Sequence, residues 1–128
     1  MTWQTARASL DAKLTTLAGI NTAQIAWPNV AFTPTPGTLW CKVSFIPTTV
    51  APEIGSGNVH EKGVYQVSVF APAGVGMGAG LTVADNLVAL FNRVTLTGNV
   101  HCGIPTLGSP LQEPDWIHIP VQVPFQIL

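Results

Sequence analysis

The chain has 128 residues, of which only 9% are charged, and its formal net charge at pH 7 is −1. This length suits one domain, a hydrophobic fraction of 47% excludes intrinsic disorder, and five Lys and Arg residues are too few to grip nucleic-acid phosphates. We expect no transmembrane helix, signal peptide or disulfide scaffold, because no apolar run approaches about 18 residues, the N-terminus is amphipathic and only two cysteines are present.

The shortage of charge points to association. Soluble domains carry about 25% charged residues, which keep their surfaces soluble. Uncharged polar surface can be buried in a protein contact without the desolvation penalty of an ion. We therefore predict that copies of the chain or other proteins cover much of its surface. The alternative is a monomer solubilised by its many Ser, Thr, Asn and Gln residues.

The first half of the chain predicts one helix, a short strand and an extended hairpin. Residues 3–18 place apolar side chains three and four positions apart, which is typical of an amphipathic helix. Residues 24–27 are a short strand candidate, and residues 39–46 and 59–70 alternate as strands do. The turn-rich residues 48–58 lie between these two strands, so we expect a hairpin whose arm projects from the body.

The second half predicts another helix and a long C-terminal strand. Residues 71–80 contain four alternating glycines and predict a loop, and residues 81–92 have the apolar spacing of a helix. Residues 99–104 predict a short strand, followed by a Pro/Gly loop over 105–115. In residues 117–127 every second residue is apolar, which predicts a strand with one buried face.

Two prolines restrict how the C-terminal strand can pair with its neighbours. Pro120 and Pro124 lack a backbone N–H, so we expect an edge strand or a bulged one. Together the elements predict an α+β fold in a single domain, residues 1–128. We expect one mostly antiparallel, mixed β-sheet with two helices packed on one face and a projecting β-hairpin arm. The other face would present uncharged polar side chains suited to a hydrogen-bonded subunit contact, namely Ser44, Gln66, Ser68, Gln122 and Gln126.

The glycine-rich loop is the first candidate for chemistry. Gly74, Gly76 and Ala79 match the pattern G-x-G-x-x-A between a strand and a helix. A dinucleotide site also needs a parallel βαβ unit and an acidic residue about 20 positions further on. The stretch after the second helix has no such residue, and the sequence contains no P-loop. A small nucleotide-binding module using the Gly74–Gly80 loop is therefore only an alternative function.

The other polar residues predict neither an active site nor a metal site. His60, His101 and His118 lack the paired spacing of zinc ligands. Cys41 shares a face with apolar residues and is expected to be buried, and Glu113 and Asp115 are a closely spaced carboxylate pair in a loop. We expect no catalytic, metal-binding or cofactor-binding residue, no cofactor and no enzyme activity.

Three stretches of the sequence resemble a known family. They are Ile-Ala-Trp-Pro-Asn-Val-Ala-Phe-Thr-Pro at 25–34, Tyr-Gln-Val-Ser-Val-Phe-Ala-Pro-Ala-Gly-Val-Gly at 65–76 and Leu-Gln-Glu-Pro-Asp-Trp at 111–116. With the N-terminal helix and the projecting hairpin, they resemble the tail-terminator-like proteins of long-tailed (siphophage-type) bacteriophages and prophages. The resemblance covers nearly the whole chain, in loop and strand phrases rather than catalytic motifs.

The resemblance implies a structural virion protein without catalytic residues. Such proteins close into a homo-oligomeric ring of six, cap the tail tube at its head-proximal end and join it to head-completion or neck proteins. The chain would assemble in the host cytoplasm, contact no membrane and let DNA pass through the ring without specific binding. A head–tail connector or a tail-tube subunit is the alternative within the virion.

Position in such a ring suggests which residues make contacts. The arm, the loop before the last strand and the tryptophans are candidates, because tryptophan is enriched at association hot spots. The expected protein-interface residues are Trp40, Thr48, Val50, Ile54, Leu107, Leu111 and Trp116.

Overall fold

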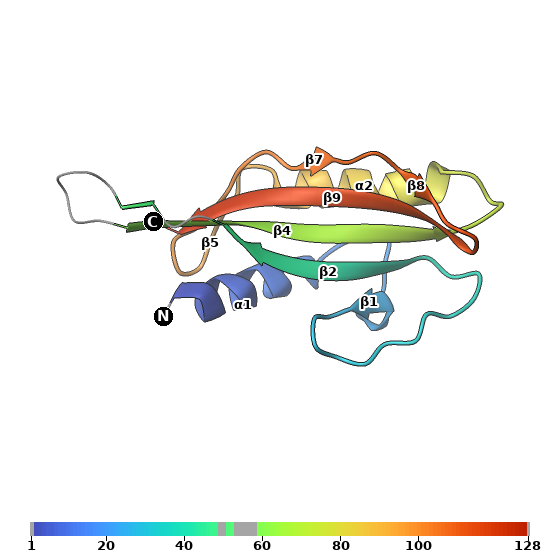
Figure 1. Cartoon of the computed structure of the whole chain (residues 1–128), viewed down its shortest axis with the longest axis horizontal. Coiled ribbons are helices and arrows are strands. Elements are labelled where there is room, and N and C mark those ends of the chain that lie inside the picture. Colours follow the sequence, from blue (N-terminus) through green and yellow to red (C-terminus); the bar gives the residue numbers. More distant parts are fainter. Residues whose placement is uncertain (1, 49–50, 53–58, 128) are drawn as a thin grey trace.

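The computed structural model describes residues 2–48, 51–52 and 59–127, which form a mixed β-sheet and two α-helices (Figure 1). The long strands run antiparallel in the order β2-β4-β9, and β1 pairs with β2 in parallel. The predicted α+β class is confirmed. The elements are α1 (Thr2–Leu14), a 3₁₀ turn (Thr22–Gln24), β1 (Ile25–Ala26), β2 (Trp40–Pro47), β3 (Ala51–Pro52), β4 (Val59–Pro72), α2 (Gly78–Phe91), β5 (Thr95–Leu96), β6 (Val100–Cys102), β7 (Thr106–Leu107), β8 (Leu111–Gln112) and β9 (Trp116–Ile127).

Both helices pack on one face of the sheet and enclose the core. The odd-numbered side chains of β2, β4 and β9 point into this core, as their alternation predicted. Gly80 allows the first turn of α2 to approach the sheet, because a Cβ atom there would lie 2.9 Å from the Ile119 side chain. The largest fully buried side chains include Tyr65, Phe91, Leu10, Leu14, Leu87 and Ile119.

One end of each helix differs from the predicted position. α1 ends at Leu14 rather than at residue 18, and the hydroxyls of Thr15 and Thr16 each donate to a carbonyl three residues earlier. Such hydroxyl groups compete with the helical N–H donors. α2 begins at Gly78, three residues before the predicted start. The Thr82 hydroxyl therefore lies inside the helix and donates to the Gly78 carbonyl.

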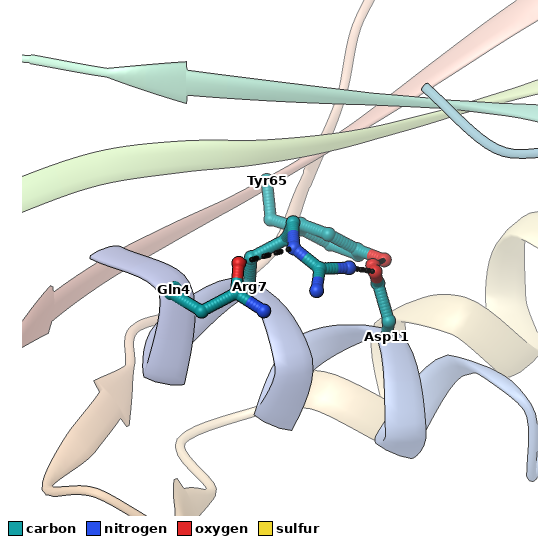
Figure 2. Close-up of polar contacts among 4 residues, drawn as sticks. All are labelled: Gln4, Arg7, Asp11 and Tyr65. Carbon is teal, nitrogen blue, oxygen red and sulfur yellow. Dashed lines mark hydrogen bonds and ion pairs between the residues drawn. The ribbon is translucent and has the colours of Figure 1, made fainter. Parts of the chain in front are cut away.

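A polar network ties α1 to the buried side of β4 (Figure 2). The hydroxyl of Tyr65 donates to Asp11 Oδ1 at 2.5 Å, and Arg7 Nη1 donates to Asp11 Oδ2 at 2.6 Å. Arg7 Nε in turn donates to Gln4 Oε1 at 3.3 Å. Burial raises the pKa of the Tyr65 phenol, and the hydrogen bond to Asp11 raises it further. The network therefore keeps Tyr65 protonated and satisfies its hydroxyl within the core.

Strand β9 lies inside the sheet, so the prediction of an edge strand is wrong. β4 pairs along one side of β9, and β6, β7 and β8 pair in turn along the other. The carbonyls of Pro120 and Pro124 accept hydrogen bonds of 2.8 Å from the N–H groups of Gly108 and Gly103. Because the N and C=O of a strand residue point to the same side, both proline nitrogens face this outer segment. The ladder between β9 and β4 therefore loses no donor.

β9 itself pairs with β4 without a bulge, and the extra residues lie in the outer segment that pairs with its other side. The outer segment advances from Cys102 to Thr106 while β9 advances only from Phe125 to Gln122, so one residue is extra. A second extra residue separates β7 from β8. Each extra residue reverses which side chains face the helices. The outer segment is thus broken into three short strands, which tolerate the missing proline donors.

The base of the arm extends past the rest of the sheet (Figure 1). β4 begins at Val59, and its first two residues pair with β3 alone. At the end of β2, the N–H and the hydroxyl of Thr48 both donate to the Lys62 carbonyl at 2.9 Å. These contacts confirm a β-hairpin that leaves the body of the sheet.

Candidate protein-interaction surface

The face of the sheet opposite the helices, called here the open face, carries the even-numbered side chains of the long strands. Its composition changes along the strands, from aromatic through uncharged polar to apolar. Within the described residues, no helix is long and apolar enough to cross a membrane. The cross-strand rows of this face are Trp40-Phe70-His118, Lys42-Ser68-Pro120, Ser44-Gln66-Gln122 and Ile46-Val64-Pro124.

Stacked rings form one end of the open face. The Trp40 and Phe70 ring centroids lie 4.2 Å apart with planes 8° apart, and Phe70 stacks on His118 at 4.6 Å and 3°. Trp116 meets Trp40 edge to face at 5.9 Å, and Phe32 packs on Trp40 at 5.3 Å. Phe70 is buried and the other four rings are half-buried, and together they form a rigid apolar platform that continues into the exposed side chains around it.

Two nitrogens in this platform are buried without a hydrogen-bond partner among the described residues. They are Nε1 of Trp40 and Nε2 of His118. Burial lowers the pKa of His118, Glu113 raises it and Lys42 lowers it. The imidazole is therefore favoured in its neutral form, which stacks on Phe70 without bringing an unpaired charge into the platform.

The middle of the open face is hydrogen-bonded within the chain. Gln122 Nε2 donates to Gln66 Oε1 at 3.2 Å, and Gln66 Nε2 donates to Ser68 Oγ at 3.1 Å. Ser68 is buried, whereas Gln122 is exposed. Part of the polar surface expected to bind another subunit is therefore already paired internally, and the rest is accessible.

The predicted interface residues divide into separate groups. Trp40 and Trp116 pack together in the platform, and Leu111, 54% exposed, pairs with His118 beside them. Leu107, 42% exposed, pairs with Val121 on the helix side of the sheet. Sequence reasoning missed the contributions of Phe70, His118 and Phe32. Alternation placed Phe70 and His118 on this face, but no local signal showed that their strands are neighbours.

The remaining predicted interface residues belong to the arm. Thr48 is exposed at the opposite end of the sheet from the platform. Val50 and Ile54 lie outside the described residues. The predicted set therefore does not form a single patch, and its role in contacts stays a prediction.

The sequence candidates for chemistry were the cysteines, the possible metal ligands and the glycine-rich loop. Cys41 and Cys102 are buried free thiols, and burial raises their pKa values to about 12 and about 11, which disfavours the nucleophilic thiolate. No group of three or more His, Cys, Asp or Glu residues suited to a metal ion occurs in the described part of the chain. Cβ atoms built on Gly74 and Gly76 would meet no atom within 4 Å, so this loop is open rather than a close-fitting cradle.

Comparison with known proteins identifies a family and a similar fold. A family model described as "Phage tail terminator protein" matches residues 5–125. One solved structure matches with a TM-score of 0.77 and 24% sequence identity, covering 100% of this chain and 96% of that chain. At this identity the match shows the fold alone. No curated protein sequence matches significantly.

Proposed function

This chain belongs to the phage tail terminator family, and we propose that six copies close into a ring that caps the tail tube. The protein is a structural component of the virion tail. The observation that carries the proposal is the family match, which spans residues 5–125. The ring would lie at the head-proximal end of the tail and bind head-completion or neck proteins. Assembly would take place in the host cytoplasm.

Several features of the chain support a capping role. The open face offers an aromatic platform and accessible uncharged polar groups, which can be buried against protein at little desolvation cost. A ring formed by head-to-tail contacts has two unlike faces, one for the tube and one for the neck. With five Lys and Arg residues and a net charge of −1, the ring would let DNA pass without holding it. We propose that the chain acts through contact and shape, without catalysis or a cofactor.

The test is to remove the chain from the phage and examine the tails. A phage lacking it should make tail tubes of uncontrolled length that do not join heads, and supplying the wild-type chain in trans should restore tails of one length. Negative-stain electron microscopy measures both. Tails of normal length on normal heads in the mutant would rule the proposal out.

The same deletion, together with electron microscopy of the purified chain, separates the terminator role from those of a tail-tube subunit and a head–tail connector. A tail-tube subunit should polymerise into long tubes when purified, and its loss should leave no tubes at all. A head–tail connector should leave tails of normal length that stay detached from heads. The terminator role predicts that the purified chain forms rings that do not stack into tubes, either alone or on the ends of tail tubes.

A further inference from the structure

A hollow lies at the arm end of the open face. Its volume is about 220 Å³, below the roughly 300–1,000 Å³ of typical small-molecule sites, so its size suits protein side chains. Of its apolar lining residues, Pro124 has its side chain on this face, whereas the side chains of Cys102 and Phe125 point into the core. Two potentially cationic side chains border the hollow. The residues that line it are Lys62, the segment 101–103 and the segment 124–126.

The polar groups of this hollow are suited to an anion. Lys62 and His101 flank Gln126 in one cross-strand row. The Thr95 hydroxyl lies 3.3 Å from His101 Nδ1 and can donate to it, and the tautomer that results carries a donor at Nε2. Glu61 is the nearest carboxylate in sequence, but alternation points it to the other face of β4. A carboxylate entering from the open face therefore meets donors and a positive charge.

A complementary element lies at the opposite end of the same sheet. The hairpin between β8 and β9, residues 111–115, is exposed at every position. A hydrogen bond of 2.8 Å from the Glu113 N–H to the Trp116 carbonyl closes its turn. The hairpin presents the carboxylates of Glu113 and Asp115 beside the apolar side chain of Leu111, 54% exposed. Carboxylates and an exposed leucine match the donors and the apolar Pro124 ring of the hollow.

The hairpin cannot reach the hollow of its own chain. β9 runs from Trp116, next to the hairpin, to Phe125, which lines the hollow. At about 3.3 Å per residue this separation is roughly 30 Å. Only another copy can bring the two together, and such a contact joins unlike ends of successive copies. Contacts of this head-to-tail kind generate a ring when the rotation closes.

We propose that the 111–115 hairpin of one copy occupies the hollow bordered by Lys62 and His101 of the next copy in the ring. This inference rests on the proposed ring and specifies how its subunits meet. Leu111 packs on the Pro124 ring, and Glu113 and Asp115 pair with Lys62 and the His101 ring. In each protomer the hollow is completed by the neighbouring chain.

The test exchanges the charges of the two ends. One variant carries E113K and D115K, a second carries K62E and H101E, and a third carries all four substitutions. D85K is the matched control, because Asp85 is an exposed carboxylate on α2, away from both ends. Sedimentation velocity of the purified chain, and co-sedimentation with tail tubes, measure assembly. Circular dichroism melting shows that each variant is folded.

Each two-site variant alone should need on the order of tenfold or higher concentration to assemble, because like charges then meet across the contact. An equimolar mixture of the two should assemble again, since copies of one can alternate with copies of the other. The four-site variant should assemble by itself, and D85K should behave as wild type. If a two-site variant fails to fold, E113Q with D115N and K62Q should show a smaller loss in the same direction.

Two results separate this contact from the ring itself. If the wild-type chain neither forms rings nor binds tubes, the proposed function fails. If wild type forms rings and both charge-reversed variants still do so at the same concentration, the ring stands and this contact is wrong. Loss of assembly that neither the mixture nor the four-site variant restores would also overturn the contact.

Discussion

The two faces of the sheet are built from alternate residues of the same three strands, yet they have different roles. On the helix side, Val67, Val121 and their neighbours are completely buried by the chain's own helices. On the open side, Gln122 is exposed and Trp40 is only partly covered. Folding therefore draws its free energy mainly from one face, while the other keeps uncharged surface available for other proteins.

The largest contrast is expected between two adjacent residues of β9. Val121→Asp places a charge among buried apolar side chains, and we expect it to lower the unfolding free energy by about 4 kcal/mol or more, or to prevent folding. Gln122→Asp points to the open face and should change it by less than about 1 kcal/mol. Urea denaturation measures both. Similar losses would mean that the open face is buried after all.

A substitution in the aromatic platform should lower the unfolding free energy by an amount between those of Val121→Asp and Gln122→Asp. Trp40→Ala removes stacking on Phe70 and packing on Phe32, and because Trp40 is half-buried we expect a loss of about 2 kcal/mol. Ile46→Ala, on the same strand and face and 41% exposed, is the matched control and should lose less. Denaturation midpoints give the comparison. Equal losses would show that the rings contribute no more than ordinary surface side chains.

Alkaline pH should lower the unfolding free energy through the buried groups on the helix side. Burial raises the pKa of Cys41 from 9.0 to about 12, so the unfolded thiol releases its proton before the folded one does. The unfolding free energy should then fall as pH rises above about 9, by up to roughly 1.4 kcal/mol per pH unit for each such thiol. Cys41→Ala should reduce this slope between about pH 9 and 10, below the range in which Tyr65 contributes. An unchanged slope would contradict the assignment.

Acid pH should lower the stability only slightly through His118 on the open side. Burial lowers the pKa of His118 in the folded chain, so the protein's stability is complete above the ordinary histidine pKa and declines as pH falls below it. The effect should be small, because the ring is partly in contact with solvent. His118→Phe keeps the stack on Phe70 and should remove this part of the pH dependence. Melting temperatures at about pH 5 and about pH 7.5 make the comparison.

Much of the fold was predictable because it depends on local periodicity. Alternation in residues 39–46, 59–70 and 117–127 identified the long strands and their buried faces, and three-and-four spacing identified both helices. Helix ends were less predictable. At Thr15 and Thr16 side-chain hydrogen bonds to the backbone decide where α1 stops, and apolar spacing does not record that competition.

The candidate surface was only partly predictable. Trp40 and Trp116 were identified from residue type and face, but their contact with each other and with Phe70 depends on β2, β4 and β9 being neighbours. The hollow beside Lys62 was not predicted at all. It combines residues from β4, β6 and β9, and no local pattern shows that distant segments share an edge.

By itself the sequence determined the α+β class, the two-faced strands and the scarcity of charge, since these depend on residue type and near-neighbour spacing. Tertiary structure alone decided that β9 lies inside the sheet, that its prolines face a broken outer segment and that Tyr65 meets Asp11. The physical reason is that strand partners and register are chosen by packing between segments far apart in the chain. A residue's face is set by its immediate neighbours, but its contacts are set by the whole fold.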